Sequence, residues 1–236
     1  MNRLATAWVL ALSTLSGCIG GTVVERSYFS LGYPKAIVER EVAPHDATIL
    51  VRRFSAEPAY DKYEVIYRES PYAFGYYRYK LWASKPKKML GQLVTSHLRN
   101  AALVTDVLDR LVDQNPTYEL EGEVIAIEEV NRSETEWLAR LALRLTLYPY
   151  GKRRPLWVWE FDVQRPVPER SPLLVVKALS EILETQLDLA FADLDGRLGA
   201  LASGVTAPPK PPRPTATQPA AQPKAPPEEP EIKRVR

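Results

Sequence analysis

The chain has 236 residues, with 45% hydrophobic and 25% charged side chains, which is ordinary for a globular domain. Its 31 basic and 29 acidic residues leave a net charge of +2. Such a balance provides no field that would steer the protein to nucleic acid, so no nucleic-acid partner is predicted. The single cysteine rules out a disulfide within the chain.

That cysteine closes an export signal. A basic start with Arg3 precedes an apolar run, Leu4–Leu15, and the small residues Ser16 and Gly17 lead into Cys18. The run is too short to span a bilayer, so 1–17 is predicted to be a signal peptide. Small residues that end in cysteine resemble the lipobox of bacterial lipoproteins, whose cysteine carries diacylglycerol and, after cleavage, an N-acyl chain such as palmitate. The alternative is an ordinary signal peptide that contains a cysteine.

The predicted lipid on Cys18 anchors the protein without spanning the membrane. No other cofactor is expected. Ile19 follows Cys18, whereas an Asp at that position commonly retains Gram-negative lipoproteins at the inner membrane. By this analogy we expect the outer membrane, with the protein on its periplasmic face. Residues 18–27 form a membrane-proximal linker, and 28–204 fit one domain.

The first half of that domain is rich in strand signals. Tyr28–Leu31 and Ala47–Phe54 have strand character, and Val65–Arg68 with Phe74–Leu81 indicate a hairpin around a Ser-Pro turn. Pro86 then begins a helix, because proline is well tolerated at the first helical position. Its apolar stripe recurs at three and four residues: Met89, Leu90, Leu93, Val94, Leu98 and Ala101.

The second half predicts three strands and a long helix. Tyr118–Val130, Trp137–Tyr148 and Leu156–Val163 alternate in polarity and indicate an antiparallel meander. In the first strand, Leu120, Gly122, Val124 and Ala126 are expected to share one face. A helix over about Pro172–Leu201 has this apolar stripe: Val176, Leu179, Leu183, Leu187, Ala190, Leu194, Leu198 and Leu201.

Together these elements predict an α+β fold, an antiparallel β-sheet with two amphipathic helices packed on one face. The other face would carry Arg140 and Arg144 on one strand and a row of glutamates on its neighbour, so opposite charges can pair there. We expect these glutamates, which are Glu119, Glu121, Glu123, Glu128 and Glu129, to lie on a half-exposed strand rather than to act as acid–base catalysts.

The last segment, 205–236, is different in composition. Ten of the 21 prolines lie from Pro208 onward, with almost no large apolar side chain. A segment of this kind cannot offset the entropy of ordering, so a disordered tail is predicted. It is either inert or a tether.

No catalytic constellation is evident. We expect His45 to lie in a loop and His97 on the first helix, an arrangement that predicts neither a metal site nor a triad. No glycine-rich phosphate loop is present. We therefore predict no catalytic residue and no metal ligand, and a small periplasmic enzyme is the least favoured hypothesis.

The stretch 60–86 carries a family resemblance. It contains Tyr60-Asp61, Ile66-Tyr67-Arg68, Tyr76-Tyr77, Trp82-Ala83 and Pro86, with Tyr28-Phe29-Ser30-Leu31 upstream and Tyr118-Glu119-Leu120-Glu121-Gly122-Glu123-Val124 downstream. This order resembles the ABC-type transport auxiliary lipoproteins, the group that includes paraquat-inducible protein C. The resemblance covers most of 18–200 and leaves out the tail.

The resemblance implies a non-catalytic lipoprotein that docks an MCE (mammalian cell entry) domain protein, which works with an inner-membrane permease and an ATPase to move lipids. Arg68, Tyr77 and Trp82 are the candidates for partner binding, although strand aromatics usually pack in a core. Self-association stays open. The alternative function is an outer-membrane assembly lipoprotein that helps to insert barrel proteins or lipopolysaccharide.

Overall fold

The computed structural model describes residues 24–34, 42–111 and 115–203. The predicted signal peptide, Cys18 and the proline-rich tail lie outside these residues. The described elements, in chain order, are β1 Ser27–Phe29, β2 His45–Val51, β3 Ser55–Ala56, β4 Glu64–Ser70, β5 Ala73–Trp82, α2 Pro86–Ala101, β6 Val104–Leu108, β7 Tyr118–Asn131, β8 Trp137–Pro149, β9 Trp157–Val167 and α3 Pro172–Ala202.

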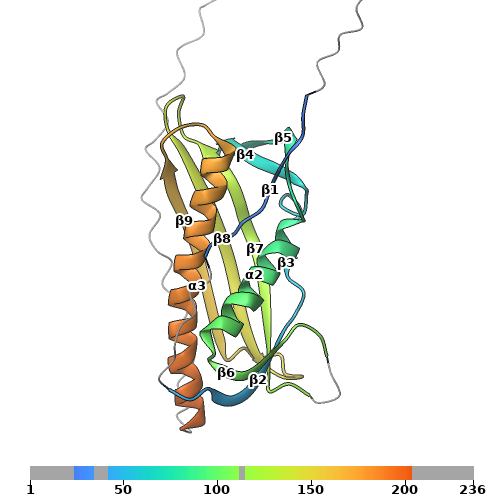
Figure 1. Cartoon of the computed structure of the whole chain (residues 1–236), viewed down its shortest axis with the longest axis vertical. Coiled ribbons are helices and arrows are strands. Elements are labelled where there is room, and N and C mark those ends of the chain that lie inside the picture. The colour runs from blue at the N-terminus through green and yellow to red at the C-terminus, as the bar shows by residue number, and fades with distance from the viewer. Residues whose placement is uncertain (1–23, 35–41, 112–114, 204–236) are drawn as a thin grey trace, which may run out of the picture.

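These elements form a strongly bent sheet with α2 and α3 side by side on one face (Figure 1). The predicted α+β class is confirmed. The predicted meander is present, since β7 pairs antiparallel with β8 and β8 with β9. The sheet is nevertheless mixed, because the first half of the chain adds several strands in parallel.

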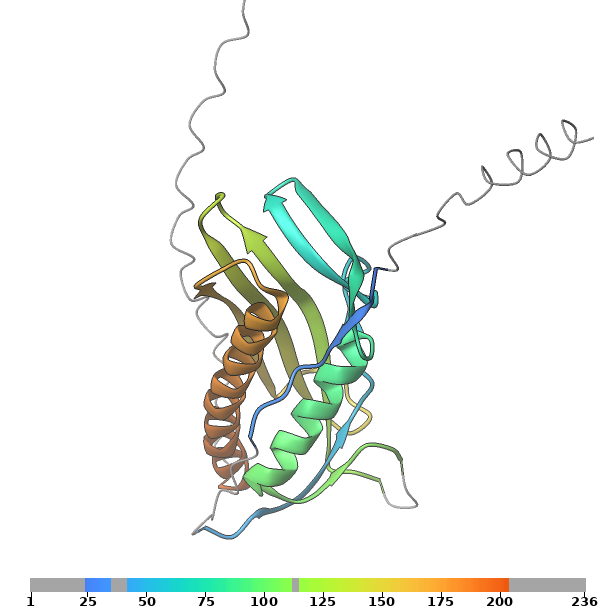
Figure 2. The same cartoon turned by 45° about the horizontal axis from the view of Figure 1, so that its top comes forward.

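The long strand β7 organises those additions. Its start pairs in parallel with β2, its middle with β3 and its end with β4. The hairpin β4–β5 is antiparallel, as predicted, and β1 adds to β5 in parallel. Because β4 and β7 run in the same direction, the β4–β5 turn and the β7–β8 turn lie at one end of the molecule (Figure 2). The β8–β9 turn lies at the other.

An irregularity in β7 changes which side chains share a face. The register with β8 shifts between Val124 and Ala126, so Ile125 is an extra residue. A bulge of this kind inverts the alternation beyond it. Ala126 therefore pairs with Ala142 rather than with a member of the leucine row. The prediction that Ala126 shares a face with Leu120 was wrong for this reason.

Both predicted helices are present, and each has proline in its first turn. The stripe of α3 is buried from Val176 to Leu198, and it packs on β8 and β9. Helix α2 ends at Ala101. The capping residue Ala102 has a φ of 48°, in the left-handed region, and its N–H donates to the carbonyl of Arg99. Among the helices of the described residues, none is long and apolar enough to cross a membrane.

Candidate functional site

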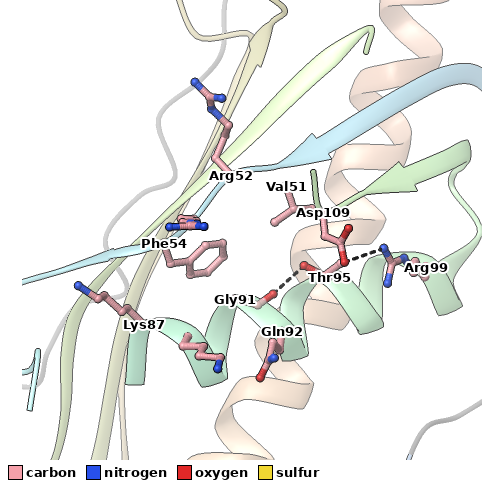
Figure 3. Close-up of a pocket in the computed structure, with 11 residues that line it drawn as sticks. Val51, Arg52, Phe54, Lys87, Gly91, Gln92, Thr95, Arg99 and Asp109 are labelled. Atoms are coloured by element: carbon pink, nitrogen blue, oxygen red, sulfur yellow. Dashed lines mark hydrogen bonds and ion pairs between the residues drawn. The ribbon is translucent and has the colours of Figure 1, made fainter. Parts of the chain in front are cut away.

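A groove of about 670 Å³ lies between the end of β2 and α2 (Figure 3). Val51 and Phe54 supply apolar surface, and α2 presents Gly91, Gln92 and Thr95. The rest of its lining is charged, with five cations and one carboxylate: Arg52, Arg53, Lys87, Lys88, Arg99 and Asp109. The groove is thus a basic cleft with an apolar floor.

Two glycines make the floor. The ring of Phe54 lies against Gly122 of β7, where an added Cβ would be 2.3 Å from the ring, and against Gly91 of α2, where it would be 3.4 Å away. Only a glycine lets the ring come this close to β7. Phe54 is therefore wedged between sheet and helix, and it holds the segment after β2 in place. The neighbouring Arg52 and Arg53 stay exposed beside the groove.

Some of the groove cations are paired at its edges. Arg52 lies 3.6 Å from a Glu119 carboxylate oxygen, and Arg99 lies 3.7 Å from Asp109 while it donates to the carbonyl of Val107. Lys87 donates to Asp61 at 2.8 Å, and this bond holds the pKa of the Asp61 carboxyl below its ordinary value.

Two cations retain an unbalanced charge. Arg53 and Lys88 are exposed, and neither has an ion pair within the described part of the chain. The groove accordingly presents positive charge to solvent above an apolar floor. Surface pairs add little energy, so even the paired cations can exchange partners. This arrangement suits an acidic ligand.

A second charged cluster is internal to the fold. Glu128 of β7 is 0% exposed, and it accepts bonds of 2.8 Å from the Tyr60 hydroxyl, from Arg68 of β4 and from Arg140 of β8. Arg140 also holds Asp162 of β9. Charge-assisted bonds of this length satisfy a carboxylate that would otherwise be costly to bury. Burial and the neighbouring Glu128 raise the pKa of Tyr60 to about 12.

The next residue, Glu129, is equally buried but pairs with other elements. Its Oε1 accepts from the Tyr77 hydroxyl at 2.8 Å and lies 3.4 Å from Arg170, which precedes α3. Its Oε2 has no partner among the described residues. Burial, followed by the bond to Glu129, raises the pKa of Tyr77 to about 12. Glu128 and Glu129 thus tie the hairpin to the meander and to α3.

The two histidines lie apart, and each contacts an aspartate of α3. His45 Nε2 is 2.7 Å from Asp195, and His97 Nε2 is 3.0 Å from Asp188, both on α3. His97 also shares a hydrogen bond with the hydroxyl of Tyr33. Among the described residues, no group of three or more His, Cys, Asp or Glu side chains is placed to hold a metal ion.

Comparison with known proteins identifies the family. The model of the ABC-type transport auxiliary lipoprotein component matches residues 29–188. The chain belongs to that family. No curated protein matches the chain.

Two crystal structures share the fold of this auxiliary lipoprotein. Protein XCC0632 from Xanthomonas campestris, assigned to the DUF330 family, is 18% identical with a TM-score of 0.62, and the match covers 74% of this chain and 99% of that one. An uncharacterised protein is 14% identical with a TM-score of 0.55, with 72% and 99% covered. At these identities the likeness concerns the fold alone.

The structure separates the three residues predicted for partner binding. Arg68 and Tyr77 are half-buried, and their polar groups hold Glu128 and Glu129. Trp82 is 1% exposed, so its indole packs in the core of the auxiliary lipoprotein and offers no surface. The expectation of half-exposed glutamates fails at Glu128 and Glu129, which are fully buried.

Sequence reasoning missed the groove. Its basic pairs, Arg52-Arg53 and Lys87-Lys88, are visible in the sequence, but they lie more than thirty residues apart. They meet only because β2 pairs with β7 in parallel and α2 crosses the same strand. Nothing in the local pattern indicates that pairing. The predicted pairing of opposite charges on the sheet is present, as in Arg144 with Glu123 and Glu160.

Proposed function

We propose that this auxiliary lipoprotein is a non-catalytic docking component of an MCE-type lipid transport system. Acyl chains on Cys18 would hold it on the periplasmic face of the outer membrane. There it would receive an MCE-domain protein that works with an inner-membrane permease and an ATPase. The observation that carries the docking role is the basic groove. Membership of the family implies a part in transport, and the groove offers a surface on which a partner can bind.

The placement of the charged side chains supports a docking role rather than a catalytic one. The two most buried carboxylates, Glu128 and Glu129, are bound by arginine and tyrosine groups that tie strands together. The groove, by contrast, has exposed cations and an apolar floor, with Asp109 as its single carboxylate. Complementary charge at an interface mainly sets specificity and the rate of association. We infer that an acidic segment of the periplasmic partner docks along α2.

Site-directed photocrosslinking in native membranes tests the partner. A photoreactive amino acid would replace Gln92, which lines the groove, and in a matched variant it would replace Thr185, which is exposed on α3. We expect an MCE-domain protein among the products of the Gln92 variant and not of the Thr185 variant. A barrel-assembly protein at Gln92 would favour the alternative function, and equal products at both positions would reject the groove.

Charge reversal tests the electrostatics of the same surface. Arg53→Glu with Lys88→Glu is expected to abolish the crosslink from Gln92 and to lower transport. The matched control is Arg153→Glu with Arg154→Glu, which makes the same change of charge in the exposed β8–β9 turn. The control should behave as the parent chain. If both double variants lose the crosslink equally, net charge rather than the groove governs docking.

A further inference from the structure

The β4–β5 hairpin carries exposed aromatic side chains at and near its turn. The Tyr76 hydroxyl donates to the carbonyl of Ala59, and the Arg68 guanidinium lies over the Phe74 ring. Tyr72 at the turn is 97% exposed, and Phe74 and Tyr76 on β5 are 43% and 40% exposed. Large apolar groups clustered on a surface usually mark an interaction site. The rings of Phe74 and Tyr76 lie edge to face, with centroids 5.7 Å apart. They form, with Tyr72, the aromatic tip of the molecule.

Only the turn of the hairpin projects beyond the sheet. Strand β4 pairs with β7 at Tyr67 and Arg68. Phe74 pairs with Arg68 and Tyr76 with Ile66, so these two rings lie level with the β4–β7 pairing and the turn with Tyr72 lies beyond it. Figure 2 shows the hairpin rising away from β7 and β8. All three rings are nevertheless exposed, so burial in the core does not account for them.

The anchor arrives at this same end. Strand β1 is parallel to β5, with Ser27 beside Lys80, and β5 runs from the tip toward the core. The chain therefore enters the domain from the side of the tip. Nine residue steps separate Cys18 from Ser27, and they span at most about 30 Å. The hairpin from Lys80 to Ala73 is at most about 23 Å long, so the anchor can lie level with the tip.

Other exposed apolar groups lie on this side. Leu173 in the first turn of α3 is exposed, and α3 begins at the end where the hairpin turns (Figures 1 and 2). Tyr28 of β1 is also exposed. The β8–β9 turn at the opposite end instead presents Lys152 and two arginines to solvent. Exposed apolar groups thus lie at the end where the lipid would enter, beside the charged side chains of the β7–β8 turn.

We propose that the aromatic tip inserts into the interfacial layer of the bilayer that holds the acyl chains of Cys18. This inference rests on the lipid anchor of the proposed function and adds a second, protein-based contact with the membrane. Tyrosine and other amphipathic rings favour the boundary between headgroups and acyl chains, because one end is apolar and the other stays hydrated. Arg78, exposed on the same strand, suits the phosphate of a headgroup.

The single cysteine makes the contact measurable. Once Cys18 is lipidated, Ala73→Cys supplies the one free thiol of the chain, at the tip and with all three rings intact. The lipidated protein would be labelled with an environment-sensitive fluorophore and reconstituted in vesicles of phosphatidylethanolamine and phosphatidylglycerol. The matched control is Lys152→Cys, in the turn at the opposite end. Quenching would be measured with aqueous iodide and with lipids that carry a nitroxide near the top of the acyl chain.

We expect the label at residue 73 to be quenched by the nitroxide lipids and shielded from iodide roughly threefold relative to residue 152, because an interfacial site excludes water. Adding Tyr72→Ser and Phe74→Ser to Ala73→Cys should remove that difference, since the rings and not the label would drive insertion. Equal iodide quenching at residues 73 and 152, with no effect of the nitroxide lipids, would refute the contact.

The same preparation separates failure of the tip from failure of the anchor. The parent chain should take up no label, because its thiol carries lipid. If it is labelled, Cys18 is unmodified, and both the anchor and the inference that rests on it are wrong. An unlabelled parent chain with a solvent-exposed label at residue 73 would leave the anchor intact and overturn the tip alone.

Discussion

Replacing the buried carboxylate of Glu128 tests whether the internal charge cluster holds the hairpin to the meander. Glu128→Gln keeps the shape of the side chain and removes its charge. Arg68 would then lose its ion pair within the described part of the chain, whereas Arg140 would keep Asp162 at 2.6 Å. The Tyr60 hydroxyl would donate to a neutral amide in place of a carboxylate.

The size of the effect follows from burial. Removing one partner of a buried ion pair costs about 3–5 kcal/mol. Arg68 and Arg140 are only partly buried and Arg140 keeps one carboxylate, so we expect a loss of about 2–4 kcal/mol. The matched control is Glu123→Gln in the exposed pair with Arg144, where both side chains are more than a third exposed. Such a pair contributes at most about 1 kcal/mol.

Urea unfolding of the Cys18→Ser chain, followed by tryptophan fluorescence, measures both changes. With a slope of about 2 kcal/mol per molar urea, Glu128→Gln should lower the midpoint by about 1–2 M. The Glu123→Gln midpoint should stay within about 0.5 M of the parent. Equal midpoints for the two variants would refute the reasoning, because they would show that the bonds to Glu128 add no more than an exposed pair does.

Two further changes test the burial of Tyr60 and the fit of Phe54. The pKa of Tyr60 is raised from 10.0 to about 12 in the folded chain. Its contribution to the free energy of unfolding is therefore complete below pH 10 and is lost as the pH rises to 12, with a slope of up to about 1.4 kcal/mol per pH unit. Urea unfolding from pH 9 to 12 should show a smaller decline in stability for Tyr60→Phe than for Tyr72→Phe, and equal declines would contradict the assignment. Gly122→Ala places a Cβ 2.3 Å from the Phe54 ring, and this overpacking should lower the stability measured by urea unfolding by about 1–3 kcal/mol. The control is Gly32→Ala, whose added Cβ meets nothing within 4 Å. Rescue of Gly122→Ala by Phe54→Val would confirm the cause, and an unchanged midpoint for Gly122→Ala would contradict it.

The elements that sequence predicts well are those that depend on nearby residues. The alternation in the meander, the Ser-Pro turn of the hairpin and the prolines that begin α2 and α3 are local signals, and all four elements are present. Parallel pairing is not local. Strands β2 and β4 join β7 across more than sixty residues, and β6 is a short strand beside β2 that local pattern did not indicate.

The same distinction explains the outcome at the charged sites. Opposite charges on neighbouring strands predict pairing, and Arg144 with Glu123 shows it. Full burial of Glu128 depends on two features that alternation does not reveal. The extra residue Ile125 changes which face the later side chains of β7 occupy. Strand β4 of the hairpin brings Arg68 to the carboxylate, and the segment before β4 brings Tyr60. A strand that is half-exposed by its pattern is thereby buried by distant segments.

The direction of α3 determines where the described chain ends relative to the aromatic tip. This helix begins at Pro172, at the end that carries the β4–β5 turn, and it ends at Ala202, at the opposite end (Figure 1). Its 31 residues extend about 47 Å at 1.5 Å per residue. A membrane contact at the aromatic tip would therefore make the chain leave the domain at the end far from the bilayer.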